Sequence, residues 1–217
     1  MSVIRTRFAP SPTGFLHVGG LRTALYAYLW AKKNNGQFLL RIEDTDRTRL
    51  VPGATENIIT TLQWAGIDFD EGPGKPGICE SYIQSERLPI YQKYAQQLIE
   101  AGHAYECFCS AERLEIVRNR QIADKLPPAY DKSCRNFTRE QVAQKKAEQP
   151  TWVVRMKVPE DGELTFNDVI RDDVTFNYKN VDEQVLIKSD GYPTYHLAVV
   201  VDDHEMQISH VIRGEEW

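Results

Sequence analysis

The sequence lacks any apolar run close to the roughly 20 residues that a membrane-spanning helix requires, and no charged-then-apolar leader opens it. Cysteine is scarce, with four in 217 residues. Without an export signal, these thiols are expected to be reduced or bound to metal rather than joined in disulfides. We therefore expect a cytoplasmic protein with no membrane partner, long enough to bury a hydrophobic core.

Positive charge is concentrated in one part of the chain. Residues 113–146 contain nine Lys and Arg against four Asp and Glu, whereas the rest of the chain is acidic and brings the net charge to −5. An acidic body with one basic segment is typical of a protein that contacts a polyanion at one place. A solvated basic helix without a partner would have the same composition, so charge alone leaves both interpretations open.

The first 70 residues alternate between strand-like and helix-like patterns. Apolar runs indicate strands within 3–9 and 37–44. Helical spacing follows each strand, first at Leu21, Ala24, Leu25, Tyr28 and Leu29 and then at Ile58, Ile59, Leu62 and Ala65. This α/β alternation predicts a parallel sheet with right-handed crossovers, and a ligand site beyond the carboxyl ends of its strands.

The middle of the chain has a different texture, with one amphipathic helix near 89–101 and strands near 151–159 and 173–180. The α/β pattern then returns with a strand, a helical run and a final strand at 210–213. We interpret 1–78 as the first half of an α/β domain, 79–184 as an inserted α+β domain, and 185–217 as the start of the second half. Because the chain stops directly after a predicted strand, we expect it to be part of a longer polypeptide.

The opening stretch RTRFAPSPTGFLHVGG is predicted to form an irregular loop between a strand and a helix, because of its prolines and glycines. Its glycines fit neither the G-x-x-x-x-G-K-[ST] nor the G-x-G-x-x-G phosphate-binding pattern. Gly14, Gly19 and Gly20 would instead let a ligand approach the backbone closely, and the helix that follows would favour an anion at its N-terminus. His17 can donate a hydrogen bond to a phosphate there, or it can simply cap the helix.

Four motifs resemble one family. FAPSPTGFLHVGG, RIEDTD, SDGYPTYHLAVVVDDH and HVIRGEEW are similar to the catalytic domain of bacterial glutamyl-tRNA synthetases, class I enzymes with a Rossmann-type sheet. HVGG stands where the class signature HIGH is expected, with Gly20 in place of the second histidine. The resemblance implies activation of L-glutamate by ATP with Mg²⁺ and transfer of the glutamyl group to the acceptor end of tRNA-Glu, with no role for DNA. It makes His17 the catalytic residue and places ATP at Pro10, Ser11, His17, Gly19 and Gly20.

Recognition of glutamate requires cations, because glutamine offers an amide where glutamate offers a carboxylate. The resemblance implies that Arg7 and Tyr195 face the side-chain carboxylate, Arg213 the α-carboxylate and Glu43 the α-amino group. Ala9 and Ser11 would line the same pocket. Without the resemblance, a surface ion pair would be the favoured interpretation of each arginine. The acidic clusters EDTD and VDDH could suggest metal sites, but we favour the amino-group role for Glu43 and a solvated turn or helix end for Asp202, Asp203 and His204.

Cys107 and Cys109 lie one residue apart, and Cys134 follows 25 residues later. Three cysteines would leave one zinc position open. Zinc-binding members of the family carry C-x-C followed by Y-x-x-x-C, which this chain matches, so the resemblance implies a structural zinc knuckle of Cys107, Cys109, Tyr130 and Cys134. The knuckle overlaps the basic segment, where the family's insertion meets the tRNA acceptor end. His103 is a weaker candidate for the fourth ligand on spacing. Unlinked thiols are the alternative to a zinc site, and Cys79 has no visible partner.

Three other interpretations stay open. A glutamyl-queuosine tRNA-Asp synthetase would share the zinc pattern, although DTDR and GEEW favour the tRNA-Glu enzyme. A non-catalytic nucleotide- or RNA-binding module of the same fold is suggested because no lysine-rich KMSKS-like loop occurs in these residues. Glutaminyl-tRNA synthetase is disfavoured by APSPTG and Arg7. We attribute the missing loop to truncation and expect the isolated chain to charge tRNA poorly.

Overall fold

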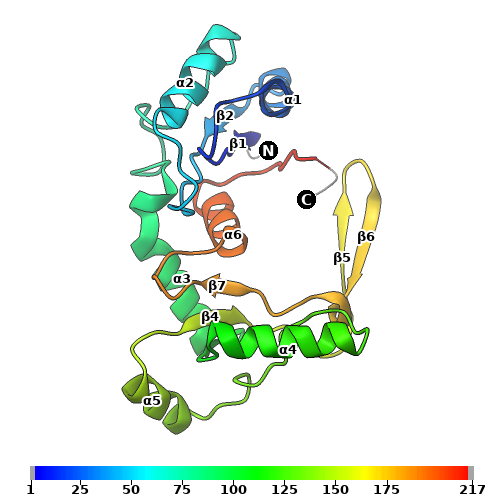
Figure 1. The fold of residues 1–217 in the computed structure, drawn as a ribbon. Coiled ribbons are helices and arrows are strands. Elements are labelled where there is room, and N and C mark those ends of the chain that lie inside the picture. Colours follow the sequence, from blue (N-terminus) through cyan, green and yellow to red (C-terminus); the bar gives the residue numbers. More distant parts are fainter. Residues whose placement is uncertain (1–2, 215–217) are drawn as a thin grey trace. The chain divides into compact units, whose positions relative to one another are not determined.

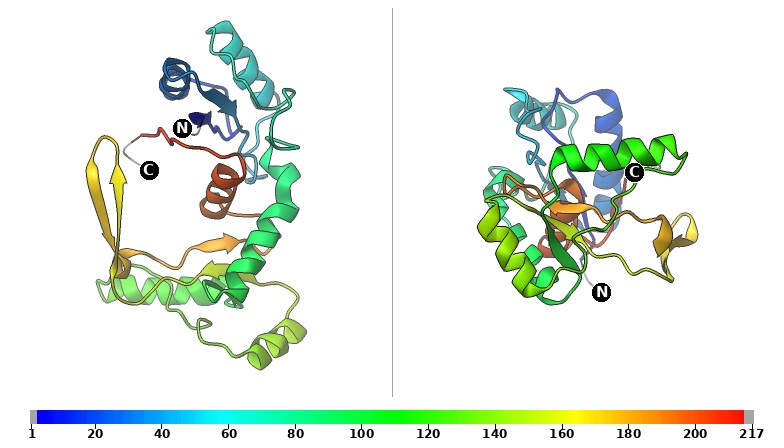
Figure 2. Two further views of the ribbon diagram at one scale, coloured as in Figure 1. Left: turned by 180° about the vertical axis from the view of Figure 1, so that it is seen from behind. Right: turned by 60° about the horizontal axis from the view of Figure 1, so that its bottom comes forward.

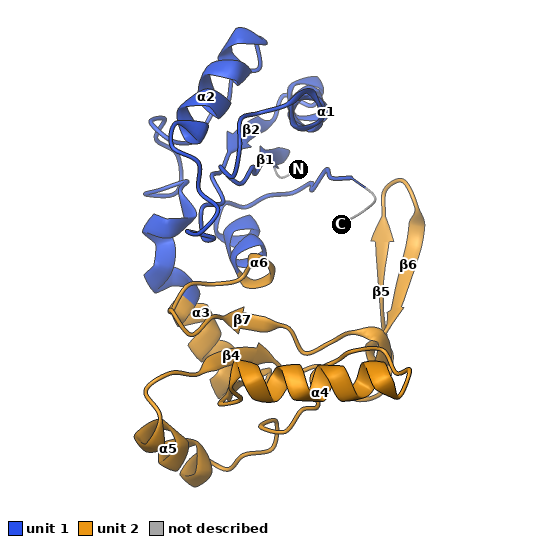
Figure 3. Ribbon diagram, in the orientation of Figure 1, with its two compact units in different colours: residues 1–91, 198–217 blue, residues 92–197 orange. Residues whose placement is uncertain are grey.

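The computed structural model describes residues 3–214. The chain forms two compact units, one made of 1–91 with 198–217 and the other of 92–197 (Figure 3). The chain passes from one unit to the other within two helices, α3 (Leu88–Glu100) and α6 (Tyr195–Glu205). Within the described residues, no helix is both long enough and apolar enough to cross a membrane.

The first unit is built around a parallel β-α-β arrangement (Figure 1). Its elements are β1 (Arg5–Phe8), α1 (Val18–Lys33), β2 (Gln37–Leu40), α2 (Ala54–Trp64), the 3-10 helix η1 (Gln84–Arg87), the start of α3 (Leu88–Glu100) and the end of α6 (Tyr195–Glu205). β1 and β2 pair in parallel from Arg5 opposite Gln37 to Phe8 opposite Leu40. The predicted parallel sheet with a helical crossover is therefore confirmed.

The core of this unit lies between α1, α2 and the two strands. Small side chains on α1 let that helix approach the strands closely, and bulky ones from the strands and α2 fill the space between them. The core contains Phe8, Ala24, Ala27, Ala31, Phe38, Leu40, Ile42, Ile58 and Leu62. The helical stripe expected on α1 is wrong in part, because Leu25 and Leu29 are exposed and Ala27 and Ala31 take the buried face.

The final strand predicted at 210–213 is not formed, and residues 207–214 are irregular. The backbone N–H groups of Ser209 and His210 both donate to the carbonyl of Arg5, at 2.9 and 3.2 Å. In the other direction, the Arg5 N–H donates to the Ser209 side chain at 2.7 Å. This side-chain hydrogen bond takes the place of a ladder bond, so the segment lies along β1 without extending the sheet.

The second unit is α+β, as the sequence predicts. A three-stranded antiparallel sheet has the order β3 (Ala104–Cys107), β4 (Val153–Met156), β7 (Val185–Ile187). A separate hairpin of β5 (Glu163–Asp168) and β6 (Asp172–Asn177) stands away from that sheet in both views of Figure 2. The remaining elements are α4 (Ala111–Ala123), α5 (Arg139–Glu148) and the 3-10 helix η2 (Tyr178–Asn180). Because β7 belongs to this unit, the compact units do not coincide with the domain boundaries expected at 78/79 and 184/185, which stay predictions.

Candidate active site

Four of the six residues predicted to contact the amino acid lie at the carboxyl edge of the parallel pair. Arg7 lies in β1, and the APSP loop leaves from the end of that strand. Backbone hydrogen bonds tie this loop to the segment after β2, from Arg41 N to Phe8 O and from Glu43 N to Pro10 O, each 3.0 Å. Parallel strands end at the same edge of a sheet, so Arg7, Ala9, Ser11 and Glu43 converge there.

Four charged side chains at this edge form a continuous series of ion pairs, which we name the ionic chain: Arg7, Asp203, Arg41 and Glu43. The Asp203 carboxylate accepts from Arg7 Nε and Nη2, at 2.9 and 3.0 Å, and from Arg41 Nη1 at 2.7 Å. Arg41 Nη2 and Nε donate to Glu43 Oε1, at 3.0 and 3.3 Å. Positive and negative groups therefore alternate along the chain.

Burial strengthens the electrostatics of this series. The Arg41 side chain is 0% exposed and that of Glu43 only 7%. Burial alone would lower the pKa of Arg41, but Glu43, Asp203 and Asp202 outweigh it and raise that pKa, so Arg41 is always a cation. Burial raises the pKa of Glu43, and Arg41 opposes the rise. Arg41 thus favours the charged form of Glu43 against the effect of burial.

Asp202 lies beside the ionic chain, 3.7 Å from Arg41 Nε. The solvated position expected for it is wrong. Its side chain is 0% exposed. It accepts hydrogen bonds from Gln84 at 2.8 Å, from Arg87 at 2.9 Å and from the Tyr91 hydroxyl at 2.9 Å. The expected helix end is correct, because both aspartates lie in the last turn of α6 and His204 is exposed there. Neither VDDH nor EDTD forms a cluster of potential metal ligands within residues 3–214.

His17 caps the N-terminus of α1. Its Nδ1 accepts a hydrogen bond from the backbone N–H of Gly19 at 3.1 Å. The capping interpretation of His17 is therefore observed. It leaves the phosphate interpretation intact, because an imidazole that accepts at Nδ1 carries its proton on Nε2 in the neutral state. The ring is exposed, so Nε2–H can donate to an anion at the positive end of the helix.

At two of the three glycines expected near this loop, a Cβ would crowd a neighbouring side chain. A Cβ on Gly19 would lie 2.9 Å from Cε1 of the His17 ring, and a Cβ on Gly20 would lie 2.7 Å from Leu16 Cδ1. Gly20 thus occupies a place where a second histidine of the class signature would need Leu16 to move. The expectation for Gly14 has no such support, since nothing in the described protein lies within 4 Å of a Cβ built there.

The two other predicted amino-acid ligands lie outside the ionic chain. Tyr195 is the first residue of α6 and 40% exposed, with its ring edge-on to His196. Arg213 is exposed in the irregular segment after Ser209, and it lines a shallow hollow with Arg22 and Tyr26 of α1. Their roles stay predictions.

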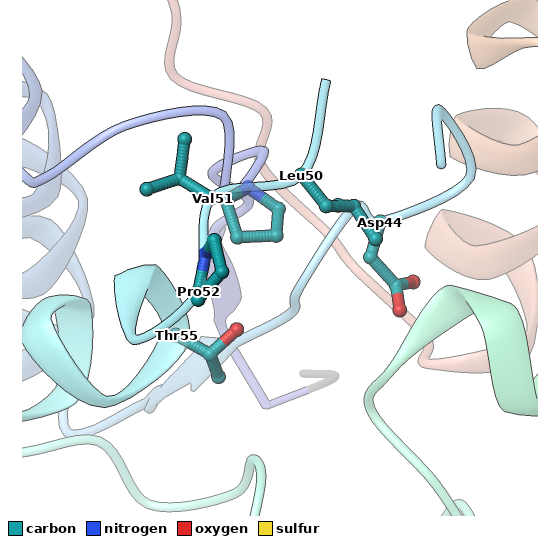
Figure 4. Close-up of a pocket in the computed structure, with 6 residues that line it drawn as sticks. Asp44, Leu50, Val51, Pro52 and Thr55 are labelled. Carbon is teal, nitrogen blue, oxygen red and sulfur yellow. The ribbon is translucent and has the colours of Figure 1, made fainter. Parts of the chain in front are cut away.

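A pocket of about 260 Å³ lies between the opening loop and the start of α2 (Figure 4). Leu50, Val51 and Pro52 give it an apolar wall, and Asp44 and Thr55 place oxygens at its margins. The backbone N–H of Val51 donates to Pro12 O at 3.0 Å, which fixes the loop against this wall. Asp44 is itself engaged, because its carboxylate accepts from the Ser85 N–H and hydroxyl at 2.8 and 2.6 Å.

The cysteines of the second unit come together as the sequence predicts. The sulfur atoms of Cys107, Cys109 and Cys134 all lie within 4.8 Å of one another, and those of Cys109 and Cys134 are 3.7 Å apart. The Tyr130 Oη lies 3.2 Å from the Cys107 sulfur and 3.6 Å from that of Cys109. All four predicted ligands therefore converge. Four donors around a zinc ion with Zn–S bonds of about 2.3 Å would place sulfurs about 3.8 Å apart, and the sulfurs of Cys109 and Cys134 have about that separation.

The basic segment forms two exposed helices, α4 and α5, in which no residue is buried. Part of its positive charge is used within the unit. Arg113 pairs with Asp131, and Arg135 pairs with the fully buried Glu183. The exposed helices satisfy both sequence interpretations, a solvated basic surface and a contact for a polyanion.

Arg41 and the partners of Asp202 were missed by sequence reasoning. The strand pattern carries one signal for Arg41, because residues at i and i+2 share a face and Arg41 stands at that spacing from Glu43. No local pattern identifies Asp203 as the partner of Arg7, since 196 residues separate them.

Comparison with known proteins identifies a family whose members resemble this chain. The family described as "tRNA synthetases class I (E and Q), catalytic domain" matches residues 3–217. The glutamate–tRNA ligases of Finegoldia magna and Alkaliphilus metalliredigens are 58% and 53% identical to the chain over its whole length, which corresponds to 46% and 45% of their own. A crystal structure of a glutamate tRNA ligase from Elizabethkingia meningosepticum in complex with its amino acid superposes with a TM-score of 0.94 at 46% identity, covering 100% of this chain and 44% of that one. The chain thus spans less than half the length of these relatives.

Proposed function

Because the chain belongs to the class I tRNA synthetases for glutamate and glutamine, as a match over residues 3–217 shows, we propose that it is the N-terminal catalytic part of a glutamate–tRNA ligase. In the proposed reaction, the α-carboxylate of L-glutamate attacks the α-phosphorus of ATP, and pyrophosphate leaves. A hydroxyl of the terminal tRNA-Glu ribose then attacks the carbonyl carbon, and AMP leaves. The proposed role implies a cytoplasmic location, where tRNA is charged.

One observation carries this proposal most strongly. A cation and an anion, Arg7 and Glu43, are fixed at the common carboxyl edge of β1 and β2, where an amino acid could meet both. Arg7 would bind the side-chain carboxylate and Glu43 the α-amino group. Ala9 and Ser11 would line the pocket, while Tyr195 and Arg213 would complete it on the side-chain and α-carboxylate sides.

ATP, with its Mg²⁺, would lie along Pro10, Ser11, Gly19 and Gly20. His17 would donate from Nε2 to the phosphate on which negative charge increases during attack. The protein forms no covalent bond to the substrates in this scheme, so positioning and charge stabilisation would supply the catalysis. The bare backbone before α1 and the positive helix end both favour an anion there.

For the second unit, we propose a structural zinc site and contact with the acceptor end of tRNA. Cys107, Cys109, Tyr130 and Cys134 would hold the ion, which would supply cross-linking between β3 and the segment before α5. Arg113 supports thiolate ligands, because its guanidinium lies 3.4 Å from the Cys109 sulfur. The basic helices would meet RNA phosphates, which position a nucleic acid without reading its sequence.

The relatives with 58% and 53% identity are glutamate–tRNA ligases, which favours this assignment over a glutamyl-queuosine enzyme or a non-catalytic module. The low charging activity expected of the isolated chain stays a prediction. The assignment is tested by thermal unfolding with two non-hydrolysable adenylate analogues, one glutamyl and one glutaminyl. The glutamyl analogue should raise the unfolding midpoint at concentrations where the glutaminyl analogue does not. Equal midpoints with both would reject a glutamate-specific pocket.

A further inference from the structure

We propose that Asp203 and Arg41 are positioning residues for amino-acid recognition, which keep the Arg7 guanidinium and the Glu43 carboxylate apart as two separate, opposite charges for glutamate to meet. The inference rests on the proposed function, because it assigns the amino acid to Arg7 and Glu43. It adds two residues that would touch no substrate and yet decide how strongly glutamate is preferred over glutamine.

Asp203 binds Arg7 through Nε and Nη2, which leaves the Nη1 amino group of the guanidinium available to a ligand. Its two oxygens accept from Nε and Nη2 of Arg7. An arginine has five N–H donors, and a carboxylate on the Nε side leaves both donors of Nη1 for another partner. The Arg7 side chain is 8% exposed, so its orientation is set by this contact rather than by water.

Arg41 acts on Glu43 in the same manner. Both of its hydrogen bonds to that carboxylate go to Oε1, which leaves Oε2 for an ammonium group. Arg41 itself is 0% exposed and cannot reach a ligand. Its third contact, from Nη1 to Asp203, joins the two halves of the ionic chain.

Asp203 and Arg41 are needed between Arg7 and Glu43 because of the charges of those two residues. Arg7 and Glu43 have opposite signs at neighbouring strand ends, and a direct pair between them would leave neither for a ligand. Asp203 gives Arg7 a competing anion, and Arg41 gives Glu43 a competing cation. The four groups are neutral as a set, which offsets the cost of burying each charge.

This arrangement predicts how selectivity arises. A glutamate side chain adds an anion beside Nη1 of Arg7, whereas a glutamine side chain presents a neutral amide and leaves the Nη1 donors without a charged acceptor. Sites that leave a buried polar group unpaired reject the wrong substrate strongly. Loss of the Asp203 charge should free Arg7 to turn toward Glu43, so the glutamyl ligand should lose more affinity than the glutaminyl one.

The test compares affinities of the glutamyl and glutaminyl adenylate analogues, measured by calorimetry, for wild type, Asp203→Asn and Asp203→Ser. The ratio of the two affinities should fall about 10-fold or more in either variant. The serine variant is included in case Asp203→Asn does not fold. The Asp203 side chain is 19% exposed, so water can fill the space beside a smaller serine and hydrogen-bond the groups that Asp203 leaves. Asp203→Glu, which keeps the charge, should restore most of the ratio.

Glu71→Gln is the matched control. It neutralises another buried carboxylate of the same unit, one that pairs with Arg5 and not with the ionic chain. Glu71→Gln should lower the unfolding midpoint but leave the ratio of the two affinities unchanged. If Asp203 had only a structural role, its variants would likewise lower the midpoint and leave that ratio unchanged. A wild-type ratio in a folded Asp203 variant overturns the inference alone. Equal affinities in the wild type overturn the proposed function and this inference with it.

Discussion

Tyr130 and Cys107 direct their Oη and Sγ atoms at each other, 3.2 Å apart, from segments separated by 23 residues. The guanidinium of Arg155 stacks 4.0 Å from the centre of the same phenol ring. Arg155 therefore covers a face of the ring, and the Tyr130 oxygen lies beside the sulfurs of Cys107 and Cys109. Burial raises the pKa of this tyrosine, so its phenol would lose the proton only when a cation replaces it.

The first prediction concerns this cluster. We expect the purified chain to retain about one Zn²⁺ per molecule after dialysis, because three sulfurs within 4.8 Å of one another converge with the Tyr130 oxygen. Cys134→Ser should abolish retention, and Tyr130→Phe should weaken it, both measured by elemental analysis. Cys79→Ser removes a thiol outside the cluster and should retain zinc like the wild type. A wild-type chain that loses all its zinc on dialysis would contradict the assignment.

The second prediction concerns acid stability through Glu71. Its carboxylate pairs with Arg5 through two hydrogen bonds of 2.7 and 2.9 Å, and it also accepts from the Tyr82 hydroxyl. Burial alone would raise the pKa of Glu71, but Arg5 and Tyr82 outweigh it and lower that pKa. A lowered pKa stabilises the folded state above the unfolded value of about 4.3, and this contribution disappears as the pH falls through the folded value.

Glu71→Gln should therefore reduce the free energy of unfolding by about 3 kcal/mol at pH 7, since it leaves the buried Arg5 without its anion. The difference from wild type should shrink as the pH is lowered below about 4. Urea unfolding at several pH values measures both effects. Asp68→Asn, at an exposed ion pair with Lys75, should change stability by less than about 1 kcal/mol. A difference that grows toward acid pH would show that the sign is wrong.

The third prediction separates the two roles of His17. Asparagine is a good N-cap residue but lacks the imidazole Nε2–H, whereas alanine loses both functions. His17→Ala should lower the free energy of unfolding by about 1 kcal/mol, and His17→Asn should leave it nearly unchanged. Both should weaken binding of the glutamyl-adenylate analogue by about 10-fold or more, as expected for a lost hydrogen bond to an anion. Wild-type affinity in His17→Asn would reduce His17 to a helix cap.

The fourth prediction concerns Asp202, which lies beside the ionic chain. Asp202 accepts from three side chains without contact with water, so Asp202→Asn should cost about 3 kcal/mol or more of unfolding free energy. The neighbouring His204 is exposed on the same helix, and His204→Gln should change stability by less than about 0.5 kcal/mol. Urea unfolding of both variants makes the comparison. Equal, small effects would mean that Asp202 is solvated after all.

The parallel strands and the loop after β1 could be predicted because strand–helix alternation and the Pro/Gly punctuation are local signals. The buried face of α1 was predicted wrongly in part. Periodicity shows that the helix has an apolar stripe, but large apolar residues such as Leu25 were assigned to the buried face in place of Ala27 and Ala31. The strand expected at 210–213 failed because the Ser209 side chain replaces a ladder bond.

The ionic chain lay beyond sequence reasoning for a different reason. Arg7 and Glu43 were singled out through motifs, but the partner that joins them belongs to an element 196 residues from Arg7. A carboxylate such as Asp202 or Asp203 has the same appearance in a sequence whether it faces water or three donors. Only tertiary structure supplies those donors, from η1, α3 and the strands.

The central claim is that this chain carries a pocket that prefers glutamate. The measurement that tests it most directly is calorimetric titration of the wild-type chain with the glutamyl-adenylate analogue and, separately, with its glutaminyl twin. The account predicts a dissociation constant lower for the glutamyl analogue by on the order of 100-fold, because the glutaminyl side chain offers the Nη1 donors of Arg7 a neutral amide in place of a carboxylate. Equal affinity for the two, or tighter binding of the glutaminyl analogue, would contradict it.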